Sequence, residues 1–224
     1  MADRLTYAVE DYLKTIYKLT RNTARASTND IAEELRVSAA SVTGMLQKLS
    51  STSPPLVDYK KHYGAALTEE GEKVALETLR HHRLIELFLH QILGYDWENV
   101  HQEAERLEHV ISEEFEEAIA QALGNPALDP HGDPIPSRDL QMPPSPSVRL
   151  ADLEPGQEAR VQRARDDDPD LLKYLRQIGL VPGVKVKVLS LSRYDELLEI
   201  SVSGRGEPVV LGPKAAKQIF VEMI

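Results

Sequence analysis

The chain has 224 residues, of which 42% are hydrophobic and 28% are charged, and it contains no cysteine. This composition is ordinary for a soluble globular protein of one to three domains. The lack of cysteine excludes disulfides, thiolate zinc sites and cysteine catalysis, so a metal site would need nitrogen and oxygen ligands. No apolar run predicts a transmembrane helix, and residues 1–4 do not begin a secretory signal, so we expect a cytoplasmic protein.

The net charge of −10 is concentrated in the middle of the chain. Residues 76–147 contain 4 basic and 14 acidic side chains and six of the seven histidines, whereas residues 1–75 and 148–224 are each charge-balanced. The acidic total is therefore only a weak argument against binding to nucleic acid. We predict three domains with these boundaries.

Residues 1–75 are predicted to form a winged helix-turn-helix domain. An apolar stripe indicates a helix over residues 7–19, and Ser27 opens a capping box before a helix over residues 28–35. After a three-residue turn, Ser38 can cap a second helix that carries Val42, Leu46 and Leu49. Short strands then bracket the basic hairpin tip KKHYG at residues 60–64.

In such a motif the second helix enters the major groove of DNA. Small residues allow a close approach, and Ser, Thr and Gln side chains can reach bases or phosphates. The candidate contacts are Ser38, Ala39, Ser41, Thr43, Gln47 and Lys48 on the helix, with Lys60, Lys61 and His62 touching phosphates from the hairpin. The alternative interpretation is a compact helical unit with a solvated hairpin.

The central segment is predicted to contain two long helices. Thr68 caps the first, which reaches about residue 93, and the second covers residues 98–123 and stops at Gly124. Their apolar stripes need a partner face, which favours a homodimer. Proline-rich residues 126–147 are predicted to be a connector.

On the second helix, Glu105, Glu108 and His109 are spaced at i, i+3 and i+4, which places them on one face. Two carboxylates and an imidazole suit a divalent first-row metal. His82 and Glu86 form another such pair on the first helix, and His101 lies near the start of the second. The alternative is that these groups face solvent. We interpret the remaining central histidines, His81, His90 and His131, as surface or core residues.

From residue 148 the pattern changes to short alternating strands at residues 158–161, 184–192 and 197–203, with a helix at residues 170–178. Several short strands in so few residues suggest a small β-barrel. The acidic run at residues 166–168 is interpreted as a solvated loop, although a carboxylate there could reach a metal. The chain is therefore expected to be mainly α with small β parts.

Five sequence segments together resemble the diphtheria toxin repressor family of metal-dependent transcriptional repressors. They are EDYLKTIY at residues 10–17, the helix-turn-helix, HRL at residues 82–84, VHQEAERLEHV at residues 100–110 and HGDPIP at residues 131–136. The resemblance covers essentially the whole chain. It implies an SH3-like C-terminal domain of the FeoA type, and a homodimer that binds a double-stranded DNA operator.

The resemblance also implies metal ligands. A primary site would consist of Asp11, Glu105, Glu108 and His109, and an ancillary site of His82, Glu86 and His101, with Asp168 or Asp170 near a further ligand position. Members of the iron-responsive branch have Met and Cys where this chain has Asp11 and Glu105, as in the manganese-responsive branch. Carboxylates favour a hard ion, so Mn²⁺ is expected, with Fe²⁺ possible.

Two departures from the family are notable. Manganese-responsive members often have a further carboxylate where this chain has Lys14, which argues against a closely spaced two-metal cluster there. Gly44 stands where some members have a base-contacting Gln, so the operator sequence cannot be inherited from the family.

We therefore expect a non-enzymatic, manganese-dependent repressor of metal-homeostasis genes, with metal as corepressor. One alternative is an iron-responsive regulator of the same family. A second is a di-metal carboxylate enzyme, which needs two Glu-x-x-His motifs, whereas only Glu98 to His101 matches. A third is a winged-helix regulator that senses a small organic ligand.

Overall fold

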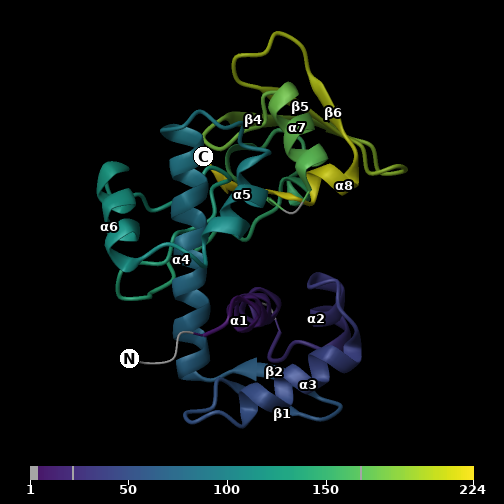
Figure 1. Cartoon of the computed structure of the whole chain (residues 1–224). Coiled ribbons are helices and arrows are strands. Elements are labelled where there is room, and N and C mark those ends of the chain that lie inside the picture. The colour runs from purple at the N-terminus through teal and green to yellow at the C-terminus, as the bar shows by residue number, and fades with distance from the viewer. Residues whose placement is uncertain (1–4, 22, 167) are drawn as a thin grey trace. The chain divides into compact units, whose positions relative to one another are not determined.

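The computed structural model describes residues 5–21, 23–166 and 168–224 (Figure 1). Residues 1–4, where we looked for a secretory signal, and Asp167 of the acidic run lie outside the described residues. The chain forms two compact units. The first unit contains the described residues up to His81 together with Glu108–Ile111 and Pro136–Met142, and the second contains the remainder. The division into three domains stays a prediction.

The first unit has the predicted winged helix-turn-helix. Its elements are α1 (Tyr7–Thr20), α2 (Thr28–Glu34), α3 (Ala39–Ser50), β1 (Val57–Lys60), β2 (Gly64–Leu67) and the start of α4 (Glu69–Gln91). Three predicted caps are present, because the side chains of Ser27, Ser38 and Thr68 accept hydrogen bonds from the backbone N–H three residues later. The hairpin is antiparallel, with Val57 opposite Leu67 and Lys60 opposite Gly64.

The apolar core of this unit fixes the position of the second helix. Leu13 and Ile16 of α1 pack with Ile31 of α2 and with Val42 and Leu46 of α3, and all five are fully buried. Burial of each such side chain stabilises a fold by about 1.5–3 kcal/mol. These contacts hold α3 on α1 and α2 and leave its other face exposed.

The second unit begins with the rest of α4 and contains two short helices, α5 (Val100–Leu107) and α6 (Glu113–Ala122). The prediction of one helix over residues 98–123 was therefore wrong. Ser112 starts a new helix because its side chain accepts a hydrogen bond from the Phe115 N–H at 3.2 Å, and acidic residues fill the following turn. Glu108 and His109 consequently lie in the segment between the helices and not on a helical face shared with Glu105.

The C-terminal part of this unit is a five-stranded antiparallel sheet in the order β6-β5-β4-β3-β7. Its elements are a short 3₁₀ turn η1 (Leu150–Asp152), β3 (Glu158–Ala164), α7 (Pro169–Gln177), β4 (Lys185–Leu191), β5 (Leu198–Val202), β6 (Val209–Leu211), α8 (Pro213–Ala216) and β7 (Ile219–Met223). The strands were expected, but the barrel is not closed: over the described residues β6 and β7 are edge strands. No helix of the described part is both long and apolar enough to span a bilayer.

Candidate metal centres and DNA-binding surface

The first candidate metal centre joins α1 to the segment between α5 and α6. Asp11, Glu108 and His109 each offer a ligand atom, and the three atoms lie within 4.8 Å of one another. His109 Nε2 is 2.9 Å from Asp11 Oδ1 and 3.3 Å from Glu108 Oε1. These three residues are members of the predicted primary site, and one oxygen from each carboxylate converges on the same imidazole nitrogen.

The imidazole of His109 is held from its other side by a residue that sequence reasoning missed. Glu10 Oε2 lies 2.6 Å from His109 Nδ1, and the Tyr7 ring stacks on the imidazole at 5.0 Å between ring centres. A carboxylate on the second nitrogen of a ligating histidine fixes the ring orientation. Burial opposes the charged imidazole, but the hydrogen bonds with Asp11 and Glu10 outweigh burial and raise the pKa of His109.

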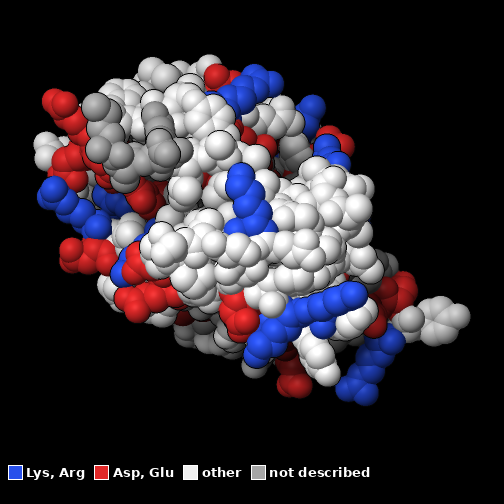
Figure 2. All heavy atoms as spheres, turned by 60° about the horizontal axis from the view of Figure 1, so that its bottom comes forward, with Lys and Arg blue, Asp and Glu red and all other residues white. Residues whose placement is uncertain are grey.

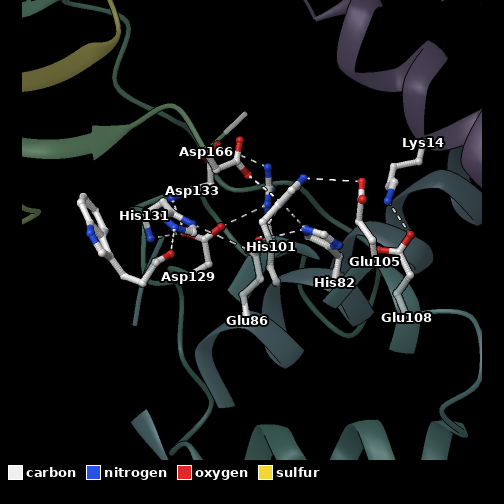
Figure 3. A network of polar contacts seen from close by, with 12 residues as sticks. Lys14, His82, Glu86, His101, Glu105, Glu108, Asp129, His131, Asp133 and Asp166 are labelled. Carbon is white, nitrogen blue, oxygen red and sulfur yellow. Dashed lines mark hydrogen bonds and ion pairs between the residues drawn. The ribbon is translucent and has the colours of Figure 1, made fainter. Parts of the chain in front are cut away.

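Lys14 also reaches this centre. It lies one turn after Asp11 on α1, and its ammonium group pairs with Glu108 Oε1 (Figure 3). Both side chains are almost completely buried, with 6% of the Lys14 side chain and none of the Glu108 side chain exposed. The cation of Lys14 is therefore part of the cluster and is not a surface charge.

Glu105, the fourth residue of the predicted primary site, belongs to the second unit and contacts a different histidine. Its Oε1 lies 3.5 Å from His101 Nε2, and its side chain is 53% exposed. The structure thus groups Glu105 with the predicted ancillary ligands. Helical spacing alone therefore does not bring Glu105 together with Glu108 and His109, because α5 ends at Leu107, and the membership of Glu105 in the primary site remains an expectation from the family resemblance.

The second candidate centre contains all three predicted ancillary residues and one more. His82, Glu86 and His101 offer ligand atoms within 4.8 Å of one another and of an atom of Asp166. Glu86 Oε1 is 3.0 Å from His82 Nε2 and 3.0 Å from His101 Nδ1, and Asp166 Oδ2 is 3.7 Å from the same His101 nitrogen (Figure 3). The spacing of His82 and Glu86 at i and i+4 predicted that these two side chains meet, and they do.

The carboxylates control the charge of His101. Burial would lower its pKa, but contacts with Glu105, Glu86 and Asp166 outweigh burial and raise the pKa of His101 to about 10. The pKa of Glu86 is well below its usual range, because attraction to His82 and hydrogen bonds from both histidines overcome the effect of complete burial. Such a concentration of anionic groups around imidazoles attracts a cation.

A third cluster shares Glu86. Glu86, Asp129 and His131 are all buried and offer ligand atoms within 4.8 Å of one another. Three of their atoms, Glu86 Oε2, Asp129 Oδ2 and His131 Nδ1, are buried and have no hydrogen-bond partner within the described structure, although the Arg83 guanidinium lies 3.6 Å from Asp129 Oδ2. Our interpretation of His131 as an ordinary surface or core histidine was incomplete, because it is fully buried with one nitrogen 3.9 Å from Glu86 Oε2.

The connector holds this cluster in place through its backbone. Asp129 Oδ1 accepts hydrogen bonds from the N–H groups of His131 and Asp133 at 2.8 and 2.9 Å, and the His131 carbonyl accepts one from Ala164 of β3. Gly132 between them has φ +88°, and a Cβ there would lie 1.8 Å from the Gln162 carbonyl oxygen. Only glycine fits this close approach of two backbones.

These donors fit a divalent first-row metal. Buried ligand atoms without hydrogen-bond partners are costly unless something pairs with them, and a cation pairs with two carboxylates and an imidazole. Burial and the neighbouring Glu86 and Asp133 raise the pKa of Asp129 well above its usual range and outweigh the opposite effect of Arg83, whose Nε lies 3.6 Å from Asp129 Oδ2, so a further cation at this cluster would be favourable. All the candidate ligand atoms are oxygen or nitrogen, which suit Mn²⁺ and Fe²⁺ better than softer ions.

Of the C-terminal carboxylates, the structure selects one that the resemblance did not. Asp166 reaches the His82–Glu86–His101 cluster, and the acidic run is therefore not merely a solvated loop. Asp168 instead caps α7 by accepting a hydrogen bond from the Leu171 N–H at 3.0 Å, and Asp170 is exposed in the first turn of that helix. Neither belongs to a metal-type cluster of the described residues.

The predicted DNA contacts lie on the surface of the first unit. Most are exposed, namely Ser38, Ala39, Ser41, Gln47, Lys48, Lys60, Lys61 and His62, and Thr43 is half-buried. The hydroxyls already have local partners: Ser38 Oγ lies 2.9 Å from Ser41 Oγ, and Thr43 Oγ1 donates to the Ala39 carbonyl. Gln47 and the lysines are therefore the longer side chains that can extend from this surface.

Charge on this face is dispersed. Figure 2, which brings the end with α3 and the β1–β2 hairpin forward, shows Lys and Arg side chains scattered among Asp and Glu around a broad uncharged area. Lys60 Nζ is 3.8 Å from Asp58 Oδ2, which reduces its contribution to a basic field. Phosphate contacts must accordingly come from individual side chains and not from one large basic patch.

Comparison with known families identifies each segment. Residues 4–65 match the family described as "Iron dependent repressor, N-terminal DNA binding domain". Residues 68–137 match "Iron dependent repressor, metal binding and dimerisation domain", and residues 148–223 match "FeoA domain".

Individual relatives agree with these matches. The iron-dependent repressor IdeR of Mycobacterium tuberculosis is 34% identical over 198 residues, which cover 83% of this chain and 85% of the relative. The transcriptional regulator MntR of Bacillus velezensis is 38% identical over 107 residues, or 48% of this chain and 73% of the relative. A solved structure of a manganese-dependent transcriptional repressor in complex with manganese is 37% identical, has a TM-score of 0.89, and matches 96% of this chain and 100% of its own. The chain belongs to the diphtheria toxin repressor family of metal-dependent, DNA-binding transcriptional repressors, which are not enzymes.

Proposed function

We propose that this protein is a manganese-dependent repressor of metal-homeostasis genes in the cytoplasm, in which Mn²⁺ is the corepressor. The observation that carries the proposal is the Asp11–Glu108–His109 cluster, in which every candidate ligand atom is oxygen or nitrogen. A hard carboxylate where iron-responsive members have sulfur ligands favours Mn²⁺ over Fe²⁺.

The connection between metal and DNA follows from where the ligands sit. Asp11 lies on α1, whose Leu13 and Ile16 pack in the same core as α2 and α3, whereas Glu108 and His109 lie in the segment that joins α5 to α6. An ion shared by these residues would tie the DNA-binding helices to the segment between the two central helices. Metal would then act through its different affinity for the tied and untied arrangements.

We further propose that the repressor is a homodimer formed through the central helices. Phe115 of α6 is 50% exposed although it continues the apolar stripe of this segment, and Ile92, Leu93 and Tyr95 after α4 are also exposed. A second copy of the chain would cover such residues. Two recognition helices would then contact DNA half-sites about one helical turn, or a multiple of it, apart.

The experiment is a gel-shift titration on the DNA upstream of the protein's own gene, with Mn²⁺, Fe²⁺ under anaerobic conditions, or chelator. Wild type should bind more tightly with Mn²⁺ than with chelator, and Glu108→Ala should lose most of that difference. Glu117→Ala, which removes a carboxylate from α6 outside the candidate clusters, is the matched control. Equal metal dependence in wild type and Glu108→Ala would exclude this cluster as the sensing site.

An iron-responsive regulator is the second candidate, because IdeR is among the relatives of this chain. The same titration separates the two. Half-maximal DNA binding at a lower concentration of Fe²⁺ than of Mn²⁺ would favour the iron-responsive alternative and contradict the manganese proposal.

A further inference from the structure

Lys14 is unusual because it buries a positive charge inside a group of candidate metal ligands. Its ammonium contacts Glu108, and only 6% of its side chain is exposed. Lysine is almost never buried to this degree unless its charge is paired. A buried ion pair is also weak evidence for stability, since replacement by apolar residues is often neutral. The position of Lys14 therefore calls for an explanation in terms of the site.

The balance of charges in the cluster explains why a cation is buried there. Glu10, Asp11 and Glu108 bring three carboxylates around one imidazole. The ammonium of Lys14 and one divalent ion together balance three negative charges. A second divalent ion would leave excess positive charge in a buried place, which is strongly unfavourable.

The geometry points the same way. Lys14 contacts Oε1 of Glu108 (Figure 3). The same oxygen lies 3.3 Å from His109 Nε2. Paired metal ions in proteins lie about 3.5–4 Å apart and share their carboxylates. The ammonium thus takes a position at Glu108 where a second ion would bind.

We propose that Lys14 is a resident cation of the Asp11–Glu108–His109 site, which limits the site to one divalent ion and lowers its affinity for that ion by competing for Glu108. The inference rests on the proposed function, because it assumes that this site binds Mn²⁺. It adds that a side chain of the protein sets both the number of ions and the concentration at which they bind.

The test counts Mn²⁺ bound to the full-length chain by equilibrium dialysis. Lys14→Glu removes the cation and adds a carboxylate, so it should bind one more ion per chain than wild type, and the added ion should produce the exchange-coupled electron paramagnetic resonance spectrum of a manganese pair. Lys14→Gln should bind as many ions as wild type but about tenfold more tightly, because a positive charge close to the ion is gone. Lys18→Glu makes the same charge change one turn further along α1 and should match wild type.

Asp11→Ala separates the two proposals and should bind one ion fewer than wild type. If it loses one ion but Lys14→Glu gains none, the role of Lys14 is wrong and the metal site stands. If Asp11→Ala binds as many ions as wild type, both proposals fail. Should Lys14→Glu not fold, as judged by its circular dichroism, Lys14→Gln decides the matter, and an affinity equal to wild type would overturn the competition.

Discussion

Replacement of Glu10 by Gln should weaken Mn²⁺ binding at the Asp11–Glu108–His109 site by about ten- to a hundredfold, the usual effect of losing a residue that orients a metal ligand. Glu10 Oε2 lies 2.6 Å from His109 Nδ1, so its carboxylate directs Nε2 toward Asp11 and Glu108. The factor corresponds to about 1.4–2.8 kcal/mol. A hydrogen bond to a charged group contributes about 1.5–3 kcal/mol, so the two magnitudes agree.

A second effect opposes the first and depends on pH. The carboxylates of Asp11 and Glu10 raise the pKa of His109, so without metal the imidazole keeps its proton to a higher pH than usual. An ion must displace that proton, and Glu10→Gln makes the displacement easier. The net loss of affinity should therefore be smaller near pH 7 and larger near pH 8.5, where the proton competes less.

The assay is competition for Mn²⁺ with a metal-binding indicator, at both pH values and without oxygen. Glu33→Gln makes the same change at an exposed site on α2 and serves as the control. The orienting role of Glu10 would be refuted if Glu10→Gln bound Mn²⁺ within twofold of wild type at both pH values while Asp11→Ala lost the ion.

Three further predictions concern other parts of the molecule. His101 has a pKa of about 10, so binding of an ion through His101 should release a proton at neutral pH, and the affinity for the ion should rise with pH well beyond pH 7. Calorimetry in buffers of different ionisation enthalpy measures the number of protons released. A wild type that releases no more protons than His101→Ala would contradict the prediction. Gly44→Ala should stabilise the fold by up to about 1 kcal/mol, because an added Cβ meets nothing within 4 Å inside α3, and chemical denaturation would show an unchanged or lower stability if the reasoning is wrong. Lys61→Ala should reduce the slope of log affinity against log salt concentration by about one unit and weaken binding to all DNA sequences alike. A changed base preference would rule out a phosphate contact.

Local signals made most of the first unit predictable. The starts of three helices could be predicted from short stretches of sequence, because Ser27, Ser38 and Thr68 each precede by three residues the N–H group that they cap. The break after Leu107 was missed because the apolar spacing of Ile111, Phe115 and Ile119 continues through it as if the helix did. The spacing of apolar side chains cannot reveal a break in a helix when the same spacing continues beyond the break. Ser112 and the acidic residues after it were the local signs of a new helix start.

Contacts between candidate ligands on one helix were predictable, whereas contacts between candidate ligands far apart in the sequence were not. His82 and Glu86 are one turn apart on α4, and their pairing followed from spacing alone. Asp129 and His131 sit in a connector without periodicity, and nothing local shows that they meet Glu86. Asp166 reaches His101 through tertiary packing, so only the fold could distinguish it from Asp168 and Asp170. Closure of the sheet likewise depends on long-range pairing that alternation does not encode.

The close approach of two backbones at Gly132 determines which substitutions the protein can tolerate at that position. In a genetic selection for repression, substitutions at position 132 should be lost as completely as substitutions of a ligand, although the residue has no side chain with which to hold a metal or touch DNA. Any added carbon collides with the Gln162 carbonyl and pushes His131 and Asp133 away from β3. The loss of function on mutation of Gly132 would come from a clash between two backbones. If every position that tolerates no mutation were taken as a ligand or a contact residue, Gly132 would be given the metal-binding role of its neighbours.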